Sequence, residues 1–410
     1  MDYSPIMNFL FLFVVLISFT VQPVFSQTQK LRTGGTFISH SEHFLGLQNG
    51  LRSSDKNVGK FNINYDTNNS SSQLVFNYNG NNNFTLDESY LQYSRGIVTF
   101  GVGAVDRHWS FSKNTSLILS HNARPSKSIY LKLKNKLGNH YLRPKTNWSI
   151  EVFNGFTEGS LDNANSMLFG IRAIITPIER LSFELVQTSQ WGGKGYDNGL
   201  TGLGSALFFD TNESSNSNIN KMAGFGFSYT TINSLIPLRV YGQAIGEDEA
   251  GSLPSCYAYL AGAEWSNKKI KYPITLGIEA VNTRTKISTN GYCGPNSIYN
   301  NYVYKYTNYG KTMGSEIDTE GNSIEFFGKS QISQELNIDY SSKAVVINGA
   351  NWPDHRLSSN RQTGLINSLG ITWAKNYLNL NGNIYYQGFF LDKANVKDGY
   401  GIGFSSSIIF

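Results

Sequence analysis

The stretch NYLNLNGNIYY, Asn376–Tyr386, decides the fold class of this chain. Leucine, isoleucine and tyrosine side chains stand at even-numbered positions from Leu378 to Tyr386, whereas asparagines fill odd-numbered positions between them. A period of two predicts a β-strand with one apolar and one polar face. Because asparagine packs poorly in a dry core but tolerates a water-filled lumen, we expect this strand in the wall of a membrane barrel.

The same alternation recurs along the chain, for example in KFNINYD (Lys60–Asp66), GFGFSY (Gly224–Tyr229) and the C-terminal GIGFSSSIIF (Gly401–Phe410). Segments of about ten residues suit tilted strands that cross a bilayer, whereas a soluble sandwich has shorter strands and a more β-branched core. We therefore predict an all-β fold, a transmembrane antiparallel barrel of about 18 strands. The expected strands lie near residues 36–47, 58–65, 72–78, 85–93, 96–104, 126–134, 146–154, 166–175, 180–190, 222–230, 237–245, 257–266, 274–284, 321–329, 332–340, 365–373, 377–387 and 400–410.

The connections between these strands sort into two classes by length. Barrels of this kind have short periplasmic turns and long extracellular loops, with both termini on the periplasmic side. If the last strand runs inward, short connections fall on the inner side and long ones on the outer side. The expected inner turns include 94–96, 176–179, 266–273 and 374–376, and the expected outer loops are 105–125, 191–221, 285–320 and 341–364.

The composition agrees with a thin apolar face around a wet interior. Charged residues make up 15% of the chain, against roughly 25% in a typical soluble protein, and Gly, Tyr and Phe number 40, 24 and 26. The net charge of +5 comes from scattered Lys and Arg residues, not from one basic patch. Nucleic acid is therefore not an expected partner, because its binding needs concentrated positive charge.

The N-terminus has the pattern of an export signal. The apolar run Phe9–Phe19 is shorter than the roughly twenty residues of a membrane helix, and Val24 and Ser26 suit a cleavage site. We expect residues 1–26 to be a removed signal peptide and residues 27–410 to form the barrel.

The two cysteines of the exported chain fall on the same side of the expected barrel. Cys256 opens one strand at the outer side, and Cys293 lies just past the end of the next strand. In an oxidising compartment such neighbours can pair, so a disulfide is a candidate and two free thiols are the alternative.

Clusters of polar and aromatic residues lie on the expected outer loops. The first cluster, VDRHWSFSKNTSLILSHNARP, spans Val105–Pro125. Aromatic faces stack on sugar C–H faces, and Arg and carboxylate groups hold hydroxyls in paired hydrogen bonds. These residues are candidates for binding polysaccharide or, alternatively, for bracing loops folded into the barrel. The candidates are Asp106, Arg107, His108, Trp109, Asn122, Arg124, Trp191, Gly192, Gly193, Gln243, Glu247 and Asp248, with a further cluster at Trp352, Asp354, His355 and Arg356.

Metal binding and catalysis find little support in the sequence. The six histidines are scattered, and the three carboxylates of GEDEAG lack the spacing of a calcium loop, so no metal or cofactor is expected. Ser120 and His121 are adjacent and would point to opposite faces of an extended segment, and no G-x-S-x-G elbow occurs. We therefore expect a non-enzyme, with a lipid hydrolase of the outer membrane as the least favoured alternative.

Four blocks occur in an order that is similar to one known family: DRHW…SLILSHNARP, ELVQTSQWGG, VYGQAIGEDEAGSLPS…AGAEW and YTNYGKTMGSEID. They resemble the capsule-assembly Wzi-type outer-membrane proteins, from about Leu86 to the C-terminus. The resemblance implies an 18-stranded barrel that acts as a surface lectin, helps to hold capsular polysaccharide or exopolysaccharide at the cell surface, and is neither the export channel nor an enzyme. The implied partners are that polysaccharide, outer-membrane lipids and the capsule-export machinery, and we expect a monomer.

Two departures from the family bear on this hypothesis. The family follows its Trp with a Gly-Pro-Gly type turn, whereas Trp109 is followed by Ser110, Phe111 and Ser112. The family also carries an N-terminal helical plug. Because few residues separate residue 26 from the first expected strand, we expect this plug to be reduced or absent here, or to be supplied by another chain. A more open barrel keeps a general or sugar-selective porin as the alternative function.

Overall fold

The structure, a computed structural model, describes residues 30–45, 56–79, 83–135, 146–157, 165–208, 219–231, 237–247, 249–250, 253–285, 293–301 and 303–409. The expected signal peptide, the question of an N-terminal plug, Asp248 and Phe410 lie outside these residues. The strands of the barrel wall are β1 (Lys30–His40), β2 (Asn57–Asp66), β3 (Ser70–Asn79), β4 (Asn83–Thr85), β5 (Tyr90–Arg95), β6 (Val98–Gly103), β7 (Lys127–Lys134), β8 (Asn147–Phe156), β9 (Met167–Ile178), β10 (Leu181–Trp191), β11 (Asn220–Thr230), β12 (Leu238–Glu247), β15 (Tyr257–Asn267), β16 (Ile274–Asn282), β19 (Asn322–Gln331), β20 (Leu336–Ile347), β21 (Gln362–Lys375), β22 (Leu378–Gln387) and β23 (Gly399–Ile409).

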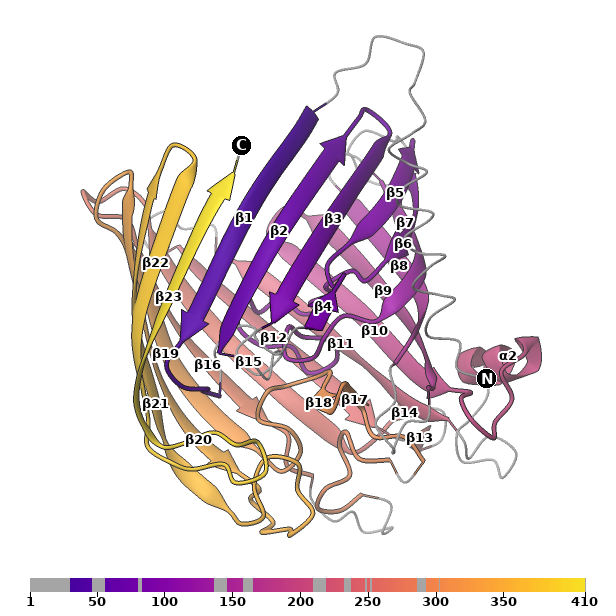
Figure 1. The fold of residues 1–410 in the computed structure, drawn as a ribbon. Coiled ribbons are helices and arrows are strands. Elements are labelled where there is room, and N and C mark those ends of the chain that lie inside the picture. The colour runs from indigo at the N-terminus through magenta and orange to yellow at the C-terminus, as the bar shows by residue number, and fades with distance from the viewer. Residues whose placement is uncertain are drawn as a thin grey trace.

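These strands form one closed antiparallel sheet (Figure 1). Each strand pairs with the next along the chain, and β1 closes the ring on β23 with Gly34 opposite Ile409 and His40 opposite Gly403. β4 and β5 pair with different parts of β3 and together occupy one strand position in the wall. The 19 strands therefore make an 18-stranded barrel. Closure leaves no free sheet edge, which is what a bilayer demands of a spanning sheet.

The alternation seen in the sequence separates the two faces of the wall. On β10 the side chain of Leu185 points outward and is 66% exposed, while the neighbouring Glu184 and Val186 are buried inside the barrel. An exposed apolar belt around a polar interior is the signature of a transmembrane barrel. Members of the outward belt include Phe37, Phe61, Phe100, Leu185, Phe225, Phe326, Leu369, Ile384 and Ile402.

Figure 1 also shows the two ends of the barrel, with short turns near the top and long loops at the bottom. Turns such as the one between β9 and β10 or between β21 and β22 join strands over two residues. We call this the turn end and the opposite one the loop end. The long connections β6–β7, β10–β11, β16–β19 and β20–β21 all fall at the loop end, as the sequence predicts.

Three expected strands were misplaced: the first strand of the chain, the strand predicted at 85–93 and the strand predicted at 332–340. The first was predicted at 36–47 but is Lys30–His40, because Phe44 and Leu45 leave the wall and turn into the barrel, where both are buried. The strand predicted at 85–93 begins only at Tyr90, as β5, because Glu88 has a left-handed φ of 70° and the hydroxyl of Ser89 bonds the backbone of Val75 on β3. The strand predicted at 332–340 is Leu336–Ile347. The preceding residues form a turn in which the Ser333 hydroxyl accepts hydrogen bonds from the next backbone amides.

One helix, α2 (Leu200–Phe208), lies in the long connection between β10 and β11 and packs against β10. The sequence alternation did not predict it. Within the described residues, no helix is long and apolar enough to cross a membrane.

Candidate functional site

Two loops fold from the loop end into the barrel. We call residues 104–126 the first luminal loop, and residues 293–301 together with 303–321 the second luminal loop. Their apolar side chains pack against luminal residues of the wall in one buried cluster, which gives the barrel a dry core where these loops enter it. The loop residues of this core are Trp109, Leu117, Ile118, Leu119, Ala123, Ile298, Tyr299, Tyr306, Met313 and Ile317.

The two luminal loops are joined through tyrosine hydroxyls. Tyr299 donates a hydrogen bond to the Leu117 carbonyl at 2.7 Å, and Tyr306 donates one to the Ile118 carbonyl at 2.9 Å. Both rings are fully buried, and burial raises the pKa of each phenol well above its ordinary value. The hydroxyls therefore stay protonated and keep donating. In the apolar run Leu117–Leu119, the second luminal loop therefore both binds backbone carbonyls and packs against the side chains.

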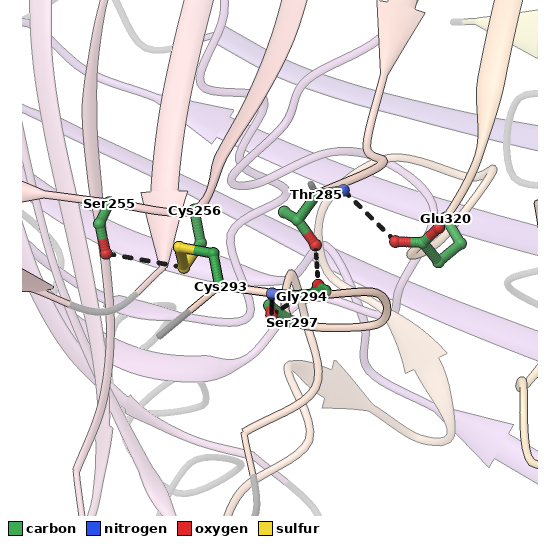
Figure 2. The surroundings of a disulfide bond; sticks show 7 residues. All are labelled: Ser255, Cys256, Thr285, Cys293, Gly294, Ser297 and Glu320. Atoms are coloured by element: carbon green, nitrogen blue, oxygen red, sulfur yellow. Dashed lines mark hydrogen bonds between the residues drawn. A yellow bond between two sulfur atoms is a disulfide. The ribbon is translucent and has the colours of Figure 1, made fainter. Parts of the chain in front are cut away.

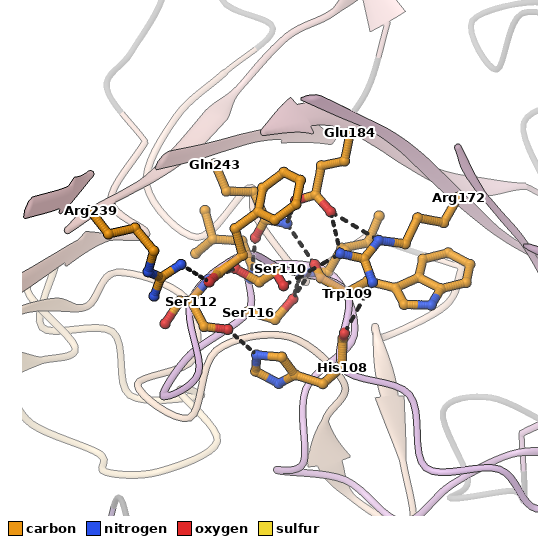
Figure 3. A network of polar contacts seen from close by, with 12 residues as sticks. His108, Trp109, Ser110, Ser112, Ser116, Arg172, Glu184, Arg239 and Gln243 are labelled. Atoms are coloured by element: carbon orange, nitrogen blue, oxygen red, sulfur yellow. Dashed lines mark hydrogen bonds and ion pairs between the residues drawn. The ribbon is translucent and has the colours of Figure 1, made fainter. Parts of the chain in front are cut away.

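A network on the barrel wall holds the turn after Trp109 (Figure 3). Gln243 on β12 accepts a hydrogen bond from the Leu117 amide at 2.9 Å and donates one to the Trp109 carbonyl at 2.6 Å. Arg172 on β9 reaches the carbonyls of His108 and Ser110, each at 3.4 Å. The wall thereby satisfies backbone groups that a buried loop would otherwise leave unpaired.

Arg172 is itself held by a buried carboxylate. Its Nε and Nη2 lie 2.9 and 2.6 Å from Glu184 Oε2, and the Glu184 side chain is completely buried. Gln243 Nε2 donates to the other oxygen of Glu184 at 3.0 Å. The two charges and the amide form one connected set, and removing one member would leave a buried charge without its partner.

The residues that replace the family's Gly-Pro-Gly turn have partners of their own. Arg239 on β12 donates to the Phe111 carbonyl at 2.8 Å and forms a paired contact with Glu264 at 3.0 and 2.7 Å. The Ser112 hydroxyl donates to Glu279 on β16. The departure in sequence therefore still yields a turn that is pinned to the wall.

Ion pairs brace both ends of the first luminal loop. Arg107 pairs with Glu151 on β8 at 2.8 Å, with its guanidinium 4.0 Å from the centre of the Phe153 ring. Arg124 makes a two-pronged contact with Asp87, at 2.6 and 3.0 Å. These arginines are fixed through planar, charge-assisted geometry, which makes them structural braces.

Trp109, one of the candidates for binding polysaccharide or bracing a loop, is only 2% exposed. Its ring meets Phe153 edge to face, with centroids 5.4 Å apart. A buried indole has no free face for a ligand, so its role in this arrangement is packing.

His108 and His121 lie face to face, with ring centroids 4.8 Å apart. His108 donates from Nε2 to the Ser112 carbonyl at 2.9 Å, and His121 Nδ1 lies 2.8 Å from Asp106. Burial, reinforced by the charges of His121 and Arg172, lowers the pKa of His108 to about 4. The neutral imidazole is therefore the form that the docked loop accommodates.

Trp191, Gly192 and Gly193 form the turn at the end of β10. Trp191 is buried and donates from its indole to Asn154 at 3.2 Å, while the Gly192 carbonyl accepts the Tyr304 hydroxyl at 2.6 Å. Gly192 has a φ of 67°, and a Cβ there would lie 2.7 Å from Asn198 Oδ1. The Gly193 amide donates to that same oxygen at 2.6 Å. Glycine is required for this turn, which presents residues 194–200 at the surface.

The disulfide ties the second luminal loop to the wall (Figure 2). Cys256, just before β15, and Cys293 are joined with their Cα atoms 5.3 Å apart. Glu247 at the end of β12 is buried and accepts the Tyr299 amide. These two attachments hold the start of the loop that meets the first luminal loop inside the barrel.

Exposed polar and aromatic groups remain on the loop end itself. One patch is residues 194–200, with Tyr196 and Lys194 exposed. A second is formed by loops 348–361 and 388–398, which Ser359 and Asp392 join through hydrogen bonds. We call these two patches the loop-end surface.

The second patch presents part of an indole. Trp352 is half-buried, and its backbone exchanges hydrogen bonds with the Asn348 side chain at 2.7 and 2.8 Å. His355 is fully buried and Arg356 pairs with Asp318, so both brace the patch. Asp354 is exposed.

Asn122 faces the interior of the barrel and not the loop-end surface. It donates to the Thr312 carbonyl at 2.9 Å and lines a cavity of about 550 Å³ inside the barrel, on the turn-end side of the luminal loops. Within the part of the chain that the structure describes, no three His, Cys, Asp or Glu side chains converge as a metal site would require.

The sequence matches the family of the capsule assembly protein Wzi over residues 22–388. The chain belongs to the Wzi capsule-assembly family. A relative from Klebsiella pneumoniae, described as an uncharacterized 55.8 kDa protein in the cps region, is 27% identical over 190 residues. That alignment covers 45% of this chain and 38% of the relative, so less than two thirds of the relative is spanned.

Solved structures agree on the barrel. One is described as Wzi, an outer membrane protein involved in group 1 capsule assembly in Escherichia coli and a carbohydrate-binding β-barrel. It superposes with a TM-score of 0.77 at 21% identity over 92% of this chain and 84% of its own. Acinetobacter baumannii OccAB2 gives 0.54 at 8% identity, over 93% and 98% of the two chains. The Wzi-family fold is thus shared with both.

Sequence reasoning missed the wall residues that hold the loops, above all Arg172, Glu184, Arg239 and Glu264. A signal was present, because each is a charge at a position where strand alternation points into the barrel. Arg172 is the single charged residue in the otherwise apolar run FGIRAII.

Proposed function

We propose that this Wzi-family barrel is exported through a cleaved signal peptide, resides in the outer membrane and holds capsular polysaccharide at its loop end without catalysing a reaction. The observation that carries the proposal is the pairing of a filled lumen with a polar, aromatic outer rim. The luminal loops occupy the interior at the loop end, while the loop-end surface remains exposed. An exposed polar and aromatic surface above a filled lumen suits a ligand that binds outside the barrel and does not pass through it.

The same packing argues against a wide, general pore. A porin leaves an aqueous channel through its lumen. Here the luminal loops share one buried core with the wall and are fixed by Arg107, Arg172, Arg239 and the disulfide. Opening would expose that core and separate several ion pairs, which makes a steady large conductance unfavourable.

The contacts to polysaccharide fall, in this proposal, on the exposed groups of the loop-end surface. Tyr196 and Trp352 offer aromatic faces, and Lys194, Asp354 and Arg361 offer polar groups beside them. Sugar recognition commonly combines an aromatic face with planar hydrogen-bonding groups. The buried candidates, among them Trp109, Trp191 and Gln243, hold the loops that display this surface.

The remaining partners follow from the position of each surface. Outer-membrane lipids contact the apolar belt, and the capsule-export machinery supplies the polymer. We propose a monomer, because the apolar surface is distributed around the whole belt and is not gathered into one patch.

A retention assay tests the proposal. The gene is deleted in a capsulated host and restored as wild type, as the double variant Tyr196→Ala, Trp352→Ala, or as the matched control Tyr93→Ala, which alters an exposed tyrosine on the outer face of β5 near the turn end. Carbohydrate is measured on washed cells and in the medium. We expect deletion and the double variant to release polymer into the medium and the control to retain it. Full retention by the deletion strain would contradict the proposal.

A further inference from the structure

The barrel contains a cavity that the loop-end surface does not use. It measures about 550 Å³ and lies between the luminal loops and the strands β16, β19, β20 and β21. Ser120, His121, Asn122 and Glu316 of the luminal loops form the side nearest the loop end. The volume falls within the roughly 300–1,000 Å³ of small-molecule sites. We call this cavity the luminal pocket.

Strand register explains why the wall is hollow here. Gly277 lies opposite Phe327, Phe327 opposite Ser341, and Ser341 opposite Ser368, on four consecutive strands. Because cross-strand partners share a face, this luminal row holds three small residues and one aromatic ring. A neighbouring cavity of about 370 Å³ along β21–β23 shares Ser341 and Ser368 with the pocket.

The ring of Phe327 rests on the wall. A Cβ at Gly277 would overlap the Phe327 ring, so the ring lies flat over the glycine backbone of the adjacent strand. One face is thus covered by the wall, while the residue lines the pocket and remains partly exposed. A flat ring over a cavity is the geometry that stacks on an apolar C–H face of a ligand.

Most charges around the pocket are already paired. Lys343 lies 2.8 Å from Glu316 and 3.0 Å from Glu325, and Glu264 is held by Arg239. Lys113 also lies 4.0 Å from Glu264, so that three cations balance three carboxylates in this frame. They provide oriented oxygen and nitrogen atoms without strongly favouring a ligand of either charge.

The next luminal row toward the turn end differs. Lys329 and Asp339 are cross-strand partners that line the pocket, and neither makes an ion pair within the described part of the chain. Thr275 stands opposite Lys329 on the other side. A hydroxyl, an ammonium and a carboxylate therefore stand in one row, two residues below the aromatic ring. The two charges attract each other across the strands, and the Thr275 hydroxyl lies 2.9 Å from that of Ser266.

Solvent reaches this part of the barrel. The Lys113 side chain lines the pocket and is 78% exposed, although it belongs to a luminal loop, and Lys329 is also exposed. The luminal loops close the pocket on the loop-end side, so access comes from the turn end.

We propose that the luminal pocket is a second ligand site, which binds a short neutral saccharide from the turn end, with the sugar stacked on Phe327. Lys329, Asp339 and Thr275 donate and accept hydrogen bonds to its hydroxyls. The aromatic platform, the balanced charges of the frame and the adjacent row of donors and acceptors together select an uncharged, polyhydroxylated molecule. This site is separate from the loop-end surface and stands independently of the proposed function.

Equilibrium dialysis of the purified barrel in detergent tests the site. The probes are glucose, galactose, N-acetylglucosamine, maltose, cellobiose and lactose, each up to about 10 mM, which covers weak binding. We expect saturable binding of at least one sugar. Phe327→Ala should weaken it by roughly tenfold, and Asp339→Asn, which preserves side-chain volume, by several-fold.

Phe326→Ala is the matched control, because Phe326 is the adjacent phenylalanine on the lipid side of the same strand and is 56% exposed. It should bind the sugar as the wild type does. Heat-modifiable mobility on gels confirms that each variant is folded, and Asp339→Asn serves if Phe327→Ala does not fold.

Binding of no probe, or binding that both pocket variants leave unchanged, would overturn the proposal and identify the cavity as a water-filled lumen only. Because the probes are small and the barrel is purified, this outcome is independent of polymer retention by cells. Loss of retention in the Tyr196→Ala, Trp352→Ala strain does not bear on the pocket.

Discussion

Replacing Arg172 by alanine should release the first luminal loop. The substitution removes both contacts with Glu184, at 2.9 and 2.6 Å, and the two 3.4 Å contacts with the carbonyls of His108 and Ser110. Glu184, whose side chain is completely buried, keeps only the 3.0 Å contact from Gln243 in this set. Removing one partner of a buried ion pair costs about 3–5 kcal/mol.

That cost falls mainly on the docked state. An undocked loop lets water reach the Glu184 carboxylate, so the penalty shrinks when the loop leaves the lumen. Since 1.4 kcal/mol is a factor of ten, the ratio of open to closed barrels should rise by roughly two to three orders of magnitude. We expect frequent openings in planar bilayers for Arg172→Ala and rare ones for the wild type.

A second variant separates the lost pair from the unpaired charge. Arg172→Met combined with Glu184→Leu replaces the pair by apolar side chains, a change that is commonly neutral or stabilising for a buried ion pair. It should return the barrel to the closed behaviour of the wild type. The reasoning is refuted if folded Arg172→Ala is as closed as the wild type, or if the double variant opens as often as the single one.

Three further results are expected. Cys256→Ser with Cys293→Ser should destabilise the barrel by about 4 kcal/mol, as chain entropy predicts for a cross-link between residues 37 apart, and should lower the midpoint of heat-modifiable gel mobility; an unchanged midpoint would contradict this. Burial lowers the pKa of His108 to about 4, so docking should be complete above about pH 6.5 and weaken as pH falls toward 4. Openings in bilayers should accordingly increase on acidification, and His108→Phe should flatten that dependence. Leu185→Arg, on the lipid face, should cost about 2–4 kcal/mol in urea unfolding from vesicles, whereas Leu185→Ile should be nearly neutral.

The barrel wall could be predicted because lipid and water impose a period of two that local sequence records directly. The alternating stretch from Leu378 to Tyr386 folds as part of β22, with Ile384 outward and Tyr385 inward. The first strand was misplaced because the residues after His40 keep an apolar pattern although they turn into the lumen. Alternation alone does not distinguish the two situations.

The inward course of the long loops was harder to predict. The partners of the first luminal loop are distant in sequence: Arg239 is 128 residues from Phe111, and Tyr299 is 182 residues from Leu117. No local pattern records such pairings. The strongest local sign was the run Leu117–Leu119, three consecutive apolar residues in a polar loop, which is costly unless the segment is buried.

Direct binding of polysaccharide to the loop end is the most telling measurement. The purified barrel is immobilised, and capsular polysaccharide from its own host is passed over the wild type, over Tyr196→Ala, Trp352→Ala, and over the control Tyr93→Ala on the outer face of β5. The account predicts saturable binding by the wild type and the control, and loss of at least tenfold in affinity for the double variant. Absence of binding by the folded wild-type barrel, or equal binding by all three proteins, would contradict the assignment of this Wzi-family surface to polysaccharide.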